Sequence, residues 1–405
     1  MKERFFKLNK WNILVENDKA KEAAIYNLYN GDIIELDEDW AKVIHYLQTG
    51  ELISKVDHPK TPEIIQTLSD KSIGKCYDKL IYEEKTRKGM LLPLKGIQSP
   101  PPVINRFFIQ LPTNCNLNCS FCNSLNSIPC LTCSNEKSEK NVEHFDYRRF
   151  LPRILDLKPI NLILHGGNPF LLGNKLNNLV NQCKYLSEST QIWVVTHWKH
   201  LFSKIKENKR NLTENLNCYI VIPASNFNED EDNSKKFCYT LDYVKNRLQS
   251  FVPVIVLDSD NNIERLREEI MKFNPQGLYV SHIYRKSNFR EFNNSHFVRV
   301  NVETFWHNFY HHPCLYGTLA LTSNGKILPC PHMKKEILAD VMNDSEPFER
   351  IFGDREIDKY WNLNLGKIEK CKECIFRYGC FECRAVELKL TNDLLGKFLC
   401  SKVGH

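Results

Sequence analysis

Clustered cysteines constrain this chain more than any other feature of its sequence. The 405 residues include sixteen cysteines, with three at 115–122, two at 130–133 and seven between 314 and 400. In a reducing compartment disulfides are rare, so metal binding is the expected use of such clusters. Four cysteines stand alone in the sequence: Cys76, Cys183, Cys218 and Cys238. An isolated cysteine usually packs in a core as a small apolar residue.

The N-terminus and the overall composition favour a cytoplasmic protein of several domains. Charged residues lie on both sides of Phe5 and Phe6, and no apolar run is long enough for a secretory signal or a membrane span. The formal charge of +6 comes from 55 basic and 49 acidic residues, a balance that does not favour nucleic acid as a partner. A chain of this length with 42% hydrophobic residues can form two or three domains. We therefore expect neither a membrane nor a nucleic acid partner.

Residues 1–95 are predicted to form a first domain of strands and helices. The segments 24–29 and 32–36 have strand composition and are joined by Asn30-Gly31, a pair typical of tight hairpin turns. Apolar residues then recur at helical spacing between Asp37 and Gly50, which are typical start and stop residues. A second helix is expected from Pro62.

Residues 103–300 are predicted to form a second domain of the α/β class. Three consecutive prolines at 100–102 separate it from the first domain, because they favour an extended linker. Short apolar runs alternate with amphipathic stretches, which indicates βα units around a parallel sheet. The six predicted strands cover residues 107–111, 161–164, 192–195, 219–222, 252–257 and 277–280. Six strands predict a partial (β/α)6 barrel, with chemistry at the carboxyl ends of the strands.

The first cysteine cluster follows the first of these strands directly. Cys115, Cys119 and Cys122 can offer three thiolates from one short loop, and a four-iron cluster with three protein ligands leaves one iron open. The motif resembles that of the radical S-adenosylmethionine superfamily, in which an aromatic residue precedes the last cysteine, here Phe121. The resemblance implies a 4Fe-4S cluster whose open iron binds S-adenosyl-L-methionine and cleaves it reductively to a 5′-deoxyadenosyl radical. A zinc site on the same loop is the alternative, although structural zinc normally has four protein ligands.

A Gly-Gly-Asn-Pro sequence follows the second predicted strand. The superfamily has Gly-Gly-Glu-Pro at this place, in contact with the methionine amino group, so the resemblance implies cofactor contacts by Gly166, Gly167, Asn168 and Pro169. Asn168 can accept a hydrogen bond but lacks the charge of the family's glutamate. Ser225, after the fourth strand, is a candidate contact for the ribose. Three further positions are equally consistent with ordinary loop residues: His197, Asp258 and Ser281.

The C-terminal cysteines resemble those of the SPASM domain, which carries two auxiliary 4Fe-4S clusters. By this resemblance the distal cluster would be bound by Cys371, Cys374, Cys380 and Cys400. The proximal cluster would be bound by Cys314, Cys330 and Cys383. Two residues separate Cys380 from Cys383 where the family usually has three, and no cysteine precedes Cys314 as a fourth proximal ligand. A histidine could serve as that fourth ligand, or one iron could stay open. For the whole region, residues 301–405, a pair of zinc ribbons is the alternative.

Two features leave several interpretations open. Cys130 and Cys133 form a further Cys-x-x-Cys pair that could be free thiols, a zinc clip or ligands of another cluster. The strand hairpin and helices of residues 1–95 resemble the winged-helix peptide-recognition element of enzymes that modify ribosomally made peptides (RiPP maturases). Such elements bind a leader peptide as an added strand. A domain that only covers one end of the barrel is the alternative.

Together these resemblances predict an oxidoreductase that matures a precursor peptide. The adenosyl radical would abstract a hydrogen atom from the peptide, and a cross-link or another oxidative modification would follow. The predicted partners are a precursor peptide with its leader segment and an external electron donor such as flavodoxin or ferredoxin. Two alternatives are a maturase that forms formylglycine in sulfatases and a non-catalytic peptide-binding protein stabilised by metal.

Overall fold

The computed structural model divides the chain into two compact units. Unit 1 comprises Met1–Ser99, Arg290–Pro313 and Tyr360–His405, and unit 2 comprises Pro100–Phe289 and Cys314–Lys359. The residues that the structure describes are 4–17, 22–81, 103–117, 119, 121–122, 131, 146–207, 216–227, 231–257, 263–282, 299–380 and 382–400. Within these ranges, no helix combines the length and the apolar character that crossing a membrane requires.

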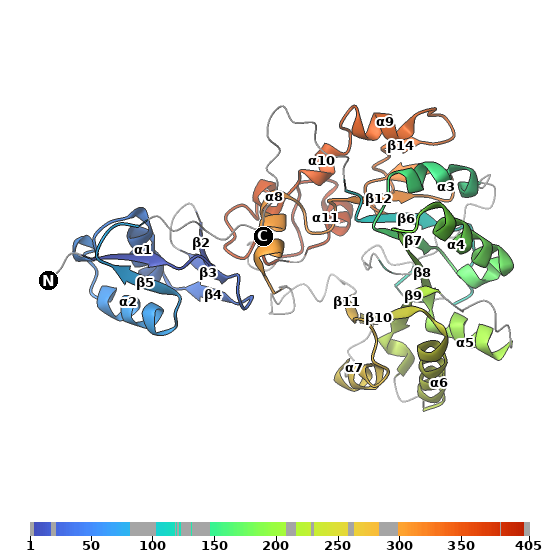
Figure 1. Ribbon diagram of the computed structural model, residues 1–405, viewed down its shortest axis with the longest axis horizontal. Coiled ribbons are helices and arrows are strands. Elements are labelled where there is room, and N and C mark those ends of the chain that lie inside the picture. Colours follow the sequence, from blue (N-terminus) through green and yellow to red (C-terminus); the bar gives the residue numbers. More distant parts are fainter. Residues whose placement is uncertain are drawn as a thin grey trace. The chain divides into compact units, whose positions relative to one another are not determined.

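Unit 2 is built on one large sheet (Figure 1). Its strands are β6 (Arg106–Gln110), β7 (Asn161–His165), β8 (Gln191–His197), β9 (Asn217–Pro223), β10 (Ser250–Leu257), β11 (Tyr279–His282), β12 (Thr318–Leu321), β13 (Lys326–Leu328) and β14 (Ala339–Asp340). They lie in the order β11-β10-β9-β8-β7-β6-β12-β13-β14, and the pairings from β11 to β12 are all parallel. The predicted α/β class with a mostly parallel sheet is confirmed, and each of the six predicted strands overlaps one of the strands β6 to β11.

Side chains on one face of this sheet form an apolar cluster that includes the cysteine loop. Phe108, Ile163 and Trp193 come from neighbouring strands and pack with Phe121, which lies in the loop after β6. Cys119 and Cys122 pack against the same cluster. Side chains alternate between the two faces of a strand, so these residues share one face of the sheet. We call it the cysteine face because Cys119 and Cys122 pack there.

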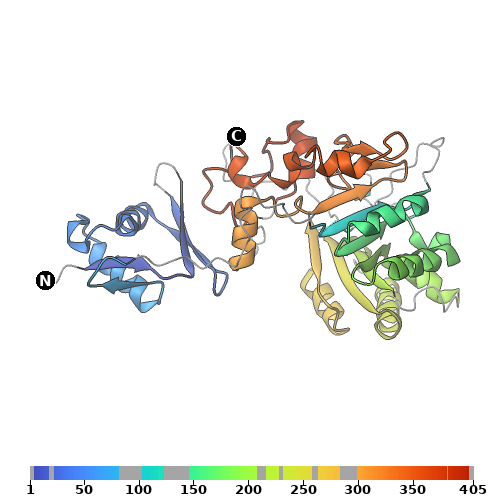
Figure 2. The same cartoon turned by 45° about the horizontal axis from the view of Figure 1, so that its top comes forward.

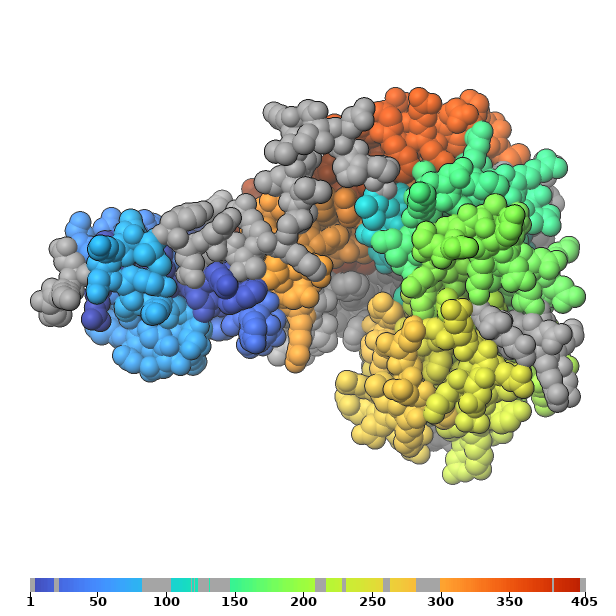
Figure 3. All heavy atoms as spheres, viewed as in Figure 1, coloured from blue at the N-terminus to red at the C-terminus, as the bar shows by residue number. Residues whose placement is uncertain are grey.

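Helices follow most of the parallel strands, as βα units require. They are α3 (Tyr147–Asp156), α4 (Asn174–Leu186), α5 (Trp198–Lys206), α6 (Glu231–Arg247) and α7 (Ile263–Met271), with short 3-10 turns η2 (Pro169–Leu172) and η4 (Ala224–Phe227). Figure 2 shows α4, α5 and α6 together along one side of the strands. In Figure 3 the atoms of α9 (Pro347–Phe352) lie beside those of α3. The Phe150 and Phe348 rings join these two helices, with centroids 5.3 Å apart.

Three strands of unit 2 lie in a region for which the sequence predicted none. β12 adds to the parallel sheet beside β6, with Thr318 opposite Arg106. The Arg106 guanidinium fixes this junction by donating to the carbonyl oxygen of Cys314 at 2.6 Å and to the Thr318 hydroxyl at 3.0 Å. β13 and β14 then continue the sheet in antiparallel fashion. Residues 314–340 therefore belong to the same sheet as the βα units.

Unit 1 contains two small antiparallel sheets. β1 (Phe5–Leu8) pairs with β5 (Gly74–Tyr77), and β2 (Asn12–Glu16), β3 (Ala23–Asn27) and β4 (Ile33–Leu36) form a three-stranded sheet in that order. The predicted hairpin of β3 and β4 is confirmed. Its turn is longer than predicted and covers residues 28–32, with Gly31 at φ 84°. The sequence did not predict β1, β2 or β5, which are short strands.

The helices of unit 1 begin near their predicted residues. α1 (Glu38–Thr49) is capped by Asp37, whose carboxylate accepts the N–H of Trp40 at 2.8 Å, and ends at Gly50 with φ 97°. α2 is Thr61–Asp70. The remaining helices are α8 (Val302–Tyr310), α11 (Arg384–Thr391) and the short turns η1 (Ile53–Lys55) and η7 (Leu365–Lys367), with α10 (Asp358–Trp361) at the boundary of the two units.

The three-stranded sheet packs against the C-terminal part of unit 1. Tyr26 on β3 is fully buried and its hydroxyl donates to the carbonyl oxygen of Ile375 at 2.8 Å. The Tyr26 ring also contacts Phe305 of α8 edge-on, with centroids 5.3 Å apart. Ile375 directly follows Cys374, so β3 supports the backbone beside a predicted ligand.

Replacing Tyr26 by Phe should destabilise unit 1. The substitution keeps the ring but leaves the Ile375 carbonyl without its buried donor, and we expect a loss of about 1–2 kcal/mol in unfolding free energy. Urea denaturation followed by circular dichroism measures it. Tyr29→Phe is the matched control, since the Tyr29 side chain is 79% exposed; equal midpoints for both variants would contradict the packing described here.

Candidate functional site

Three chain segments meet at the carboxyl edge of the parallel sheet in unit 2. The cysteine loop follows β6, the Gly-Gly-Asn-Pro segment follows β7, and His197 ends β8. Parallel strands bring their carboxyl ends to one edge, which is where such sheets place their ligands. The register supports this, because Gln110 at the end of β6 lies opposite His165 at the end of β7.

The cysteine loop places its thiols partly out of solvent. Cys115, Cys119 and Cys122 are each half-buried. Burial raises the pKa of the Cys115 thiol; the Leu117 N–H, 3.4 Å from the sulfur, opposes the shift, and Cys122 adds to it. Cys119 and Cys122 both pack against the apolar cluster of the cysteine face. Phe121 is buried on the cysteine face and anchors the loop.

The two glycines let the segment after β7 lie directly on the chain that precedes Cys115. Gly166 and Gly167 have φ values of 109° and 53°. A Cβ atom on Gly167 would lie 2.3 Å from the carbonyl oxygen of Thr113. The Asn168 N–H donates to the Asn114 carbonyl at 3.0 Å, and the Thr113 hydroxyl donates to the Gly166 carbonyl. The glycine pair therefore fixes the position of the cysteine loop through backbone contacts.

Asn168 uses its side-chain oxygen within the chain. Its Oδ1 accepts the N–H of Phe170 at 3.1 Å and caps η2, which begins with the buried Pro169. An oxygen engaged in this bond is a weaker acceptor for the methionine amino group that the family's glutamate binds. The donor set at this position therefore fits S-adenosylmethionine less well than the three thiols fit a cluster.

Two buried histidines lie beside the cysteine loop; the sequence singled out only His197, as a position equally consistent with an ordinary loop residue, and did not indicate His200. His200 on α5 has its Nε2 3.2 Å from the sulfur of Cys115, and its ring centroid is 5.9 Å from that of His197. Burial lowers the pKa of His200 to about 4. Burial also lowers the pKa of His197 well below its ordinary value, and the neighbouring His200 and Lys199 add to that shift. Both rings are therefore neutral at pH 7. Only their tertiary neighbours distinguish them from core histidines.

The other candidate contacts are less informative. Ser225 is exposed and lies in η4, just after β9. Ser281 lies within β11. Three candidates fall outside the described residues: Asp258, Cys130 and Cys133.

The predicted proximal ligands are divided between the two units. Cys314 and Cys330 belong to unit 2 and Cys383 to unit 1. Cys330 is buried, and His332 follows it by two residues. Burial, with an added effect of His332, lowers the pKa of His165 to about 3, so the segment after Cys330 lies near the end of β7.

The four predicted distal ligands all belong to unit 1, and several of them act electrostatically on one another. Burial raises the pKa of Cys371 to about 12, and Cys374 and Cys400 add to this shift. Burial likewise raises the pKa of Cys380, with contributions from Cys374 and Cys371. Within the described ranges, no group of three His, Cys, Asp or Glu residues could hold a single metal ion. A four-iron cluster makes a different demand, because each thiolate binds a different iron. Four thiols suit it chemically.

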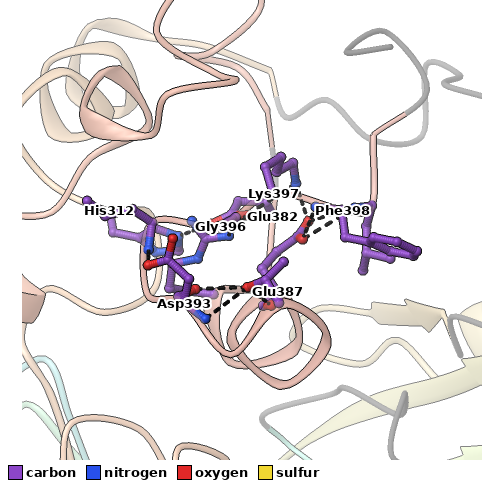
Figure 4. A network of polar contacts seen from close by, with 11 residues as sticks. His312, Glu382, Glu387, Asp393, Gly396, Lys397 and Phe398 are labelled. Atoms are coloured by element: carbon purple, nitrogen blue, oxygen red, sulfur yellow. Dashed lines mark hydrogen bonds and ion pairs between the residues drawn. The ribbon is translucent and has the colours of Figure 1, made fainter. Parts of the chain in front are cut away.

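A buried charge network is centred on Glu382, Glu387 and Lys397 (Figure 4), and Glu382 and Lys397 act electrostatically on Cys371 and Cys380. The Glu382 carboxylate accepts from His312 Nε2 at 2.7 Å and pairs with Lys397 at 3.2 Å. Burial alone would raise the pKa of Glu382, but Lys397 and Arg384 outweigh it and hold that pKa well below its ordinary value. Glu387 of α11 also pairs with Lys397 and accepts the backbone N–H groups of Phe398 and Leu399 at 2.7 and 3.2 Å. These bonds hold the backbone that leads into Cys400.

Comparisons with known proteins give only distant similarity. No protein-family profile matches the chain, and no curated protein sequence matches it. The chain is similar to the crystal structure of Streptococcus suis SuiB bound to precursor peptide SuiA, with a TM-score of 0.48 and 14% identity over 100% of this chain and 99% of that chain. It is similar to SuiB bound to S-adenosylmethionine at the same TM-score of 0.48 and 14% identity, over 98% of this chain and 100% of that chain. Similarity at this level does not establish a shared function.

Gly167→Ala should destabilise unit 2 more than a matched glycine substitution. Gly173 has φ 55°, close to the φ of 53° at Gly167, but a Cβ atom there would meet nothing within 4 Å. Gly173 has φ 55° and ψ −131°, so Gly173→Ala should lower the unfolding free energy by about 1–3 kcal/mol through backbone strain alone. Gly167→Ala should lower it by roughly 1–3 kcal/mol more because Thr113 must move. Urea denaturation compares them, and equal losses would show that the close contact with Thr113 is absent.

Proposed function

We propose that this protein is a radical S-adenosylmethionine enzyme that modifies a ribosomally made precursor peptide. One observation carries the proposal: three cysteines with the spacing of that superfamily lie in the loop after β6, at the carboxyl edge of a parallel sheet. When bound, a 4Fe-4S cluster and S-adenosylmethionine supply an adenosyl radical that takes a hydrogen atom from the peptide. The product would be a cross-link or another oxidative modification.

The residues at this edge have separate functions in the proposal. Cys115, Cys119 and Cys122 hold the cluster and leave one iron for the methionine moiety. The segment from Gly166 to Pro169 keeps the cysteine loop in place through its bonds to residues 113 and 114. Phe121 anchors the loop in the apolar cluster, which also keeps water from the cysteine face. Ser225 is the proposed ribose contact.

The C-terminal cysteines would hold auxiliary clusters as in a SPASM domain. Formation of a new bond from a peptide radical releases one electron, and an auxiliary cluster would accept it. The four-thiol group of Cys371, Cys374, Cys380 and Cys400 supports one such cluster. Cys314, Cys330 and Cys383 are the proposed ligands of the second. An external donor such as flavodoxin or ferredoxin would supply the electron that begins the reaction.

The three-stranded sheet of unit 1 is the proposed site for the leader peptide. In the described part of the chain β2 and β4 are its two edge strands. An edge strand can pair with an extended peptide through main-chain hydrogen bonds, the mode by which winged-helix recognition elements bind leaders. The helices α1 and α2 follow this sheet, in keeping with a winged-helix-like domain.

A metal-stabilised peptide-binding protein without catalysis is a second candidate. Asn168 favours it, because the charge of the family's glutamate is missing and the remaining oxygen caps η2. The two candidates differ in whether S-adenosylmethionine is cleaved.

The Cys115, Cys119 and Cys122 triple alanine variant tests the proposal. After anaerobic reconstitution we expect about eight to twelve irons per wild-type chain and about four fewer in the variant. Wild type reduced with dithionite should form 5′-deoxyadenosine from S-adenosylmethionine, and the variant should not.

A matched control removes three isolated cysteines instead. The Cys76, Cys183 and Cys238 triple alanine variant should keep both its iron and its 5′-deoxyadenosine formation. Zinc in place of iron would exclude the radical enzyme. Iron without any 5′-deoxyadenosine in wild type would favour the non-catalytic candidate.

A further inference from the structure

We propose that His197 binds S-adenosylmethionine by donating a hydrogen bond from its Nε2. This inference rests on the proposed function and deepens it. It assigns a cofactor contact to the end of β8, where the sequence alone offered only an ordinary loop residue.

The position of His197 places it at the proposed cofactor site. It is the last residue of β8 and its side chain is 1% exposed. Trp193 and Val195 on the same strand belong to the apolar cluster of the cysteine face, so strand alternation directs His197 to that face too. Its ring neighbours that of His200, which contacts the sulfur of Cys115.

Helix capping determines which ring nitrogen of His197 carries the proton. Nδ1 accepts the N–H of Lys199 at 3.1 Å and caps α5. A nitrogen that accepts cannot also carry the proton of a neutral imidazole, so Nε2 is the donor. This Nε2 is buried and has no hydrogen-bond partner among the described residues.

A buried N–H group without a partner is uncommon in folded proteins and indicates a missing acceptor. S-adenosylmethionine offers acceptors of this kind in its carboxylate, its ribose oxygens and its adenine nitrogens. At the end of β7 the chain offers the cofactor no charged side chain where the family has a glutamate. Asn168 is neutral, and its side-chain oxygen already accepts the N–H of Phe170. His197 is thus a polar contact that the site can supply from its own fold.

Three substitutions separate the Nε2 bond from the capping bond. His197→Asn keeps an excellent capping oxygen but is too short to replace Nε2. His197→Phe removes both functions, and His197→Gln retains a terminal amide donor. Equilibrium dialysis of S-adenosylmethionine against the reconstituted, unreduced proteins should give about tenfold weaker binding for Asn and Phe and near wild-type binding for Gln. Iron content should be unchanged in all three.

Fragments of the cofactor identify the acceptor. If His197 contacts the nucleoside, His197→Asn weakens binding of 5′-methylthioadenosine; if it contacts the carboxylate, the variant weakens binding of methionine. Unchanged binding of S-adenosylmethionine by both Asn and Phe variants would overturn the inference. Failure of the wild-type protein to bind it at all would instead overturn the proposed function.

A different observation carries a second inference. We infer that Arg384 donates to sulfur atoms of the distal cluster. Its side chain is fully buried, and its Nη2 donates to the Gly396 carbonyl at 2.7 Å and pairs with Glu382 at 3.1 Å. Its Nε and Nη1 are also buried and have no partner in the described part of the chain.

The groups around Arg384 indicate that sulfur atoms at the distal cysteines would accept from its Nε and Nη1. Its partner Glu382 acts electrostatically on both Cys371 and Cys380, and Arg384 follows Cys380 by four residues along the chain. Cluster and thiolate sulfurs accept hydrogen bonds, and such bonds raise the reduction potential of the cluster. A fixed guanidinium with two available donors would make the distal cluster a better electron acceptor.

Potentiometric titration tests this in the Cys115, Cys119 and Cys122 triple alanine background, where only auxiliary clusters contribute to the electron paramagnetic resonance signal. Arg384→Lys keeps the charge but not the planar set of donors, and Arg384→Met removes both. We expect a more negative midpoint potential in the order wild type, Lys, Met. The exposed Arg355, whose guanidinium side chain is 74% accessible, provides the matched control Arg355→Met.

Iron content distinguishes an effect of the substitution on the midpoint potential from an effect on cluster assembly. If Arg384→Met loses iron, Arg384→Lys decides, because it retains a cation beside Glu382. A midpoint potential of Arg384→Lys equal to wild type at full iron content would overturn the inference. A triple alanine background with no iron at all would show that the distal cluster itself is absent.

Discussion

Contact between two backbone segments organises the carboxyl edge of the sheet in unit 2. The Leu111 N–H donates to the His165 carbonyl at 2.6 Å, and two residues further along each segment the chain of Gly167 passes beside Thr113. No residue with a side chain could occupy Gly167 without moving Thr113. The parallel pairing of β6 and β7 and the glycine pair are thus one constraint, and the cysteine loop that begins at residue 115 depends on it. In the proposed enzyme this constraint would set the distance between the cluster and the cofactor segment.

Both cysteine regions combine thiols with buried N–H donors that lack a partner among the described residues. His197 lies beside the first region and Arg384 beside the distal one. A buried donor destabilises the fold unless an acceptor satisfies it. In each case neighbouring bonds fix the group: Lys199 determines the tautomer of His197, and Gly396 with Glu382 holds the guanidinium of Arg384. Fixed donors that await an acceptor are typical of preorganised ligand sites.

The sequence predicted those strands and helices whose positions depend on neighbouring residues in the chain. The strands β6 to β10 are apolar runs, and α1 has both a capping residue and a terminal glycine, so their positions followed from the sequence. β12 could not be predicted in this way, because its four residues are defined by pairing with β6 some two hundred positions earlier. The donor of His197 was likewise hidden, since it depends on the Lys199 backbone and on burial. The cysteine motifs carried chemical information in their spacing alone; the histidines did not.

The support of the distal cysteines by the N-terminal sheet has a consequence for the proposed peptide site. Tyr26 on β3 bonds to Ile375, and a Cβ atom on Gly379 would lie 2.6 Å from Ile33 on β4. The chain from Cys374 to Cys380 therefore packs against β3 and β4, and β4 is one of the two edge strands proposed to bind the peptide. Cys374 packs against the apolar cluster that contains Tyr26; burial, followed by an effect of Cys374, raises the pKa of Tyr26. The N-terminal sheet is thus part of the folded unit that holds the distal thiols, and a peptide paired with β4 would add a strand to the sheet that supports them.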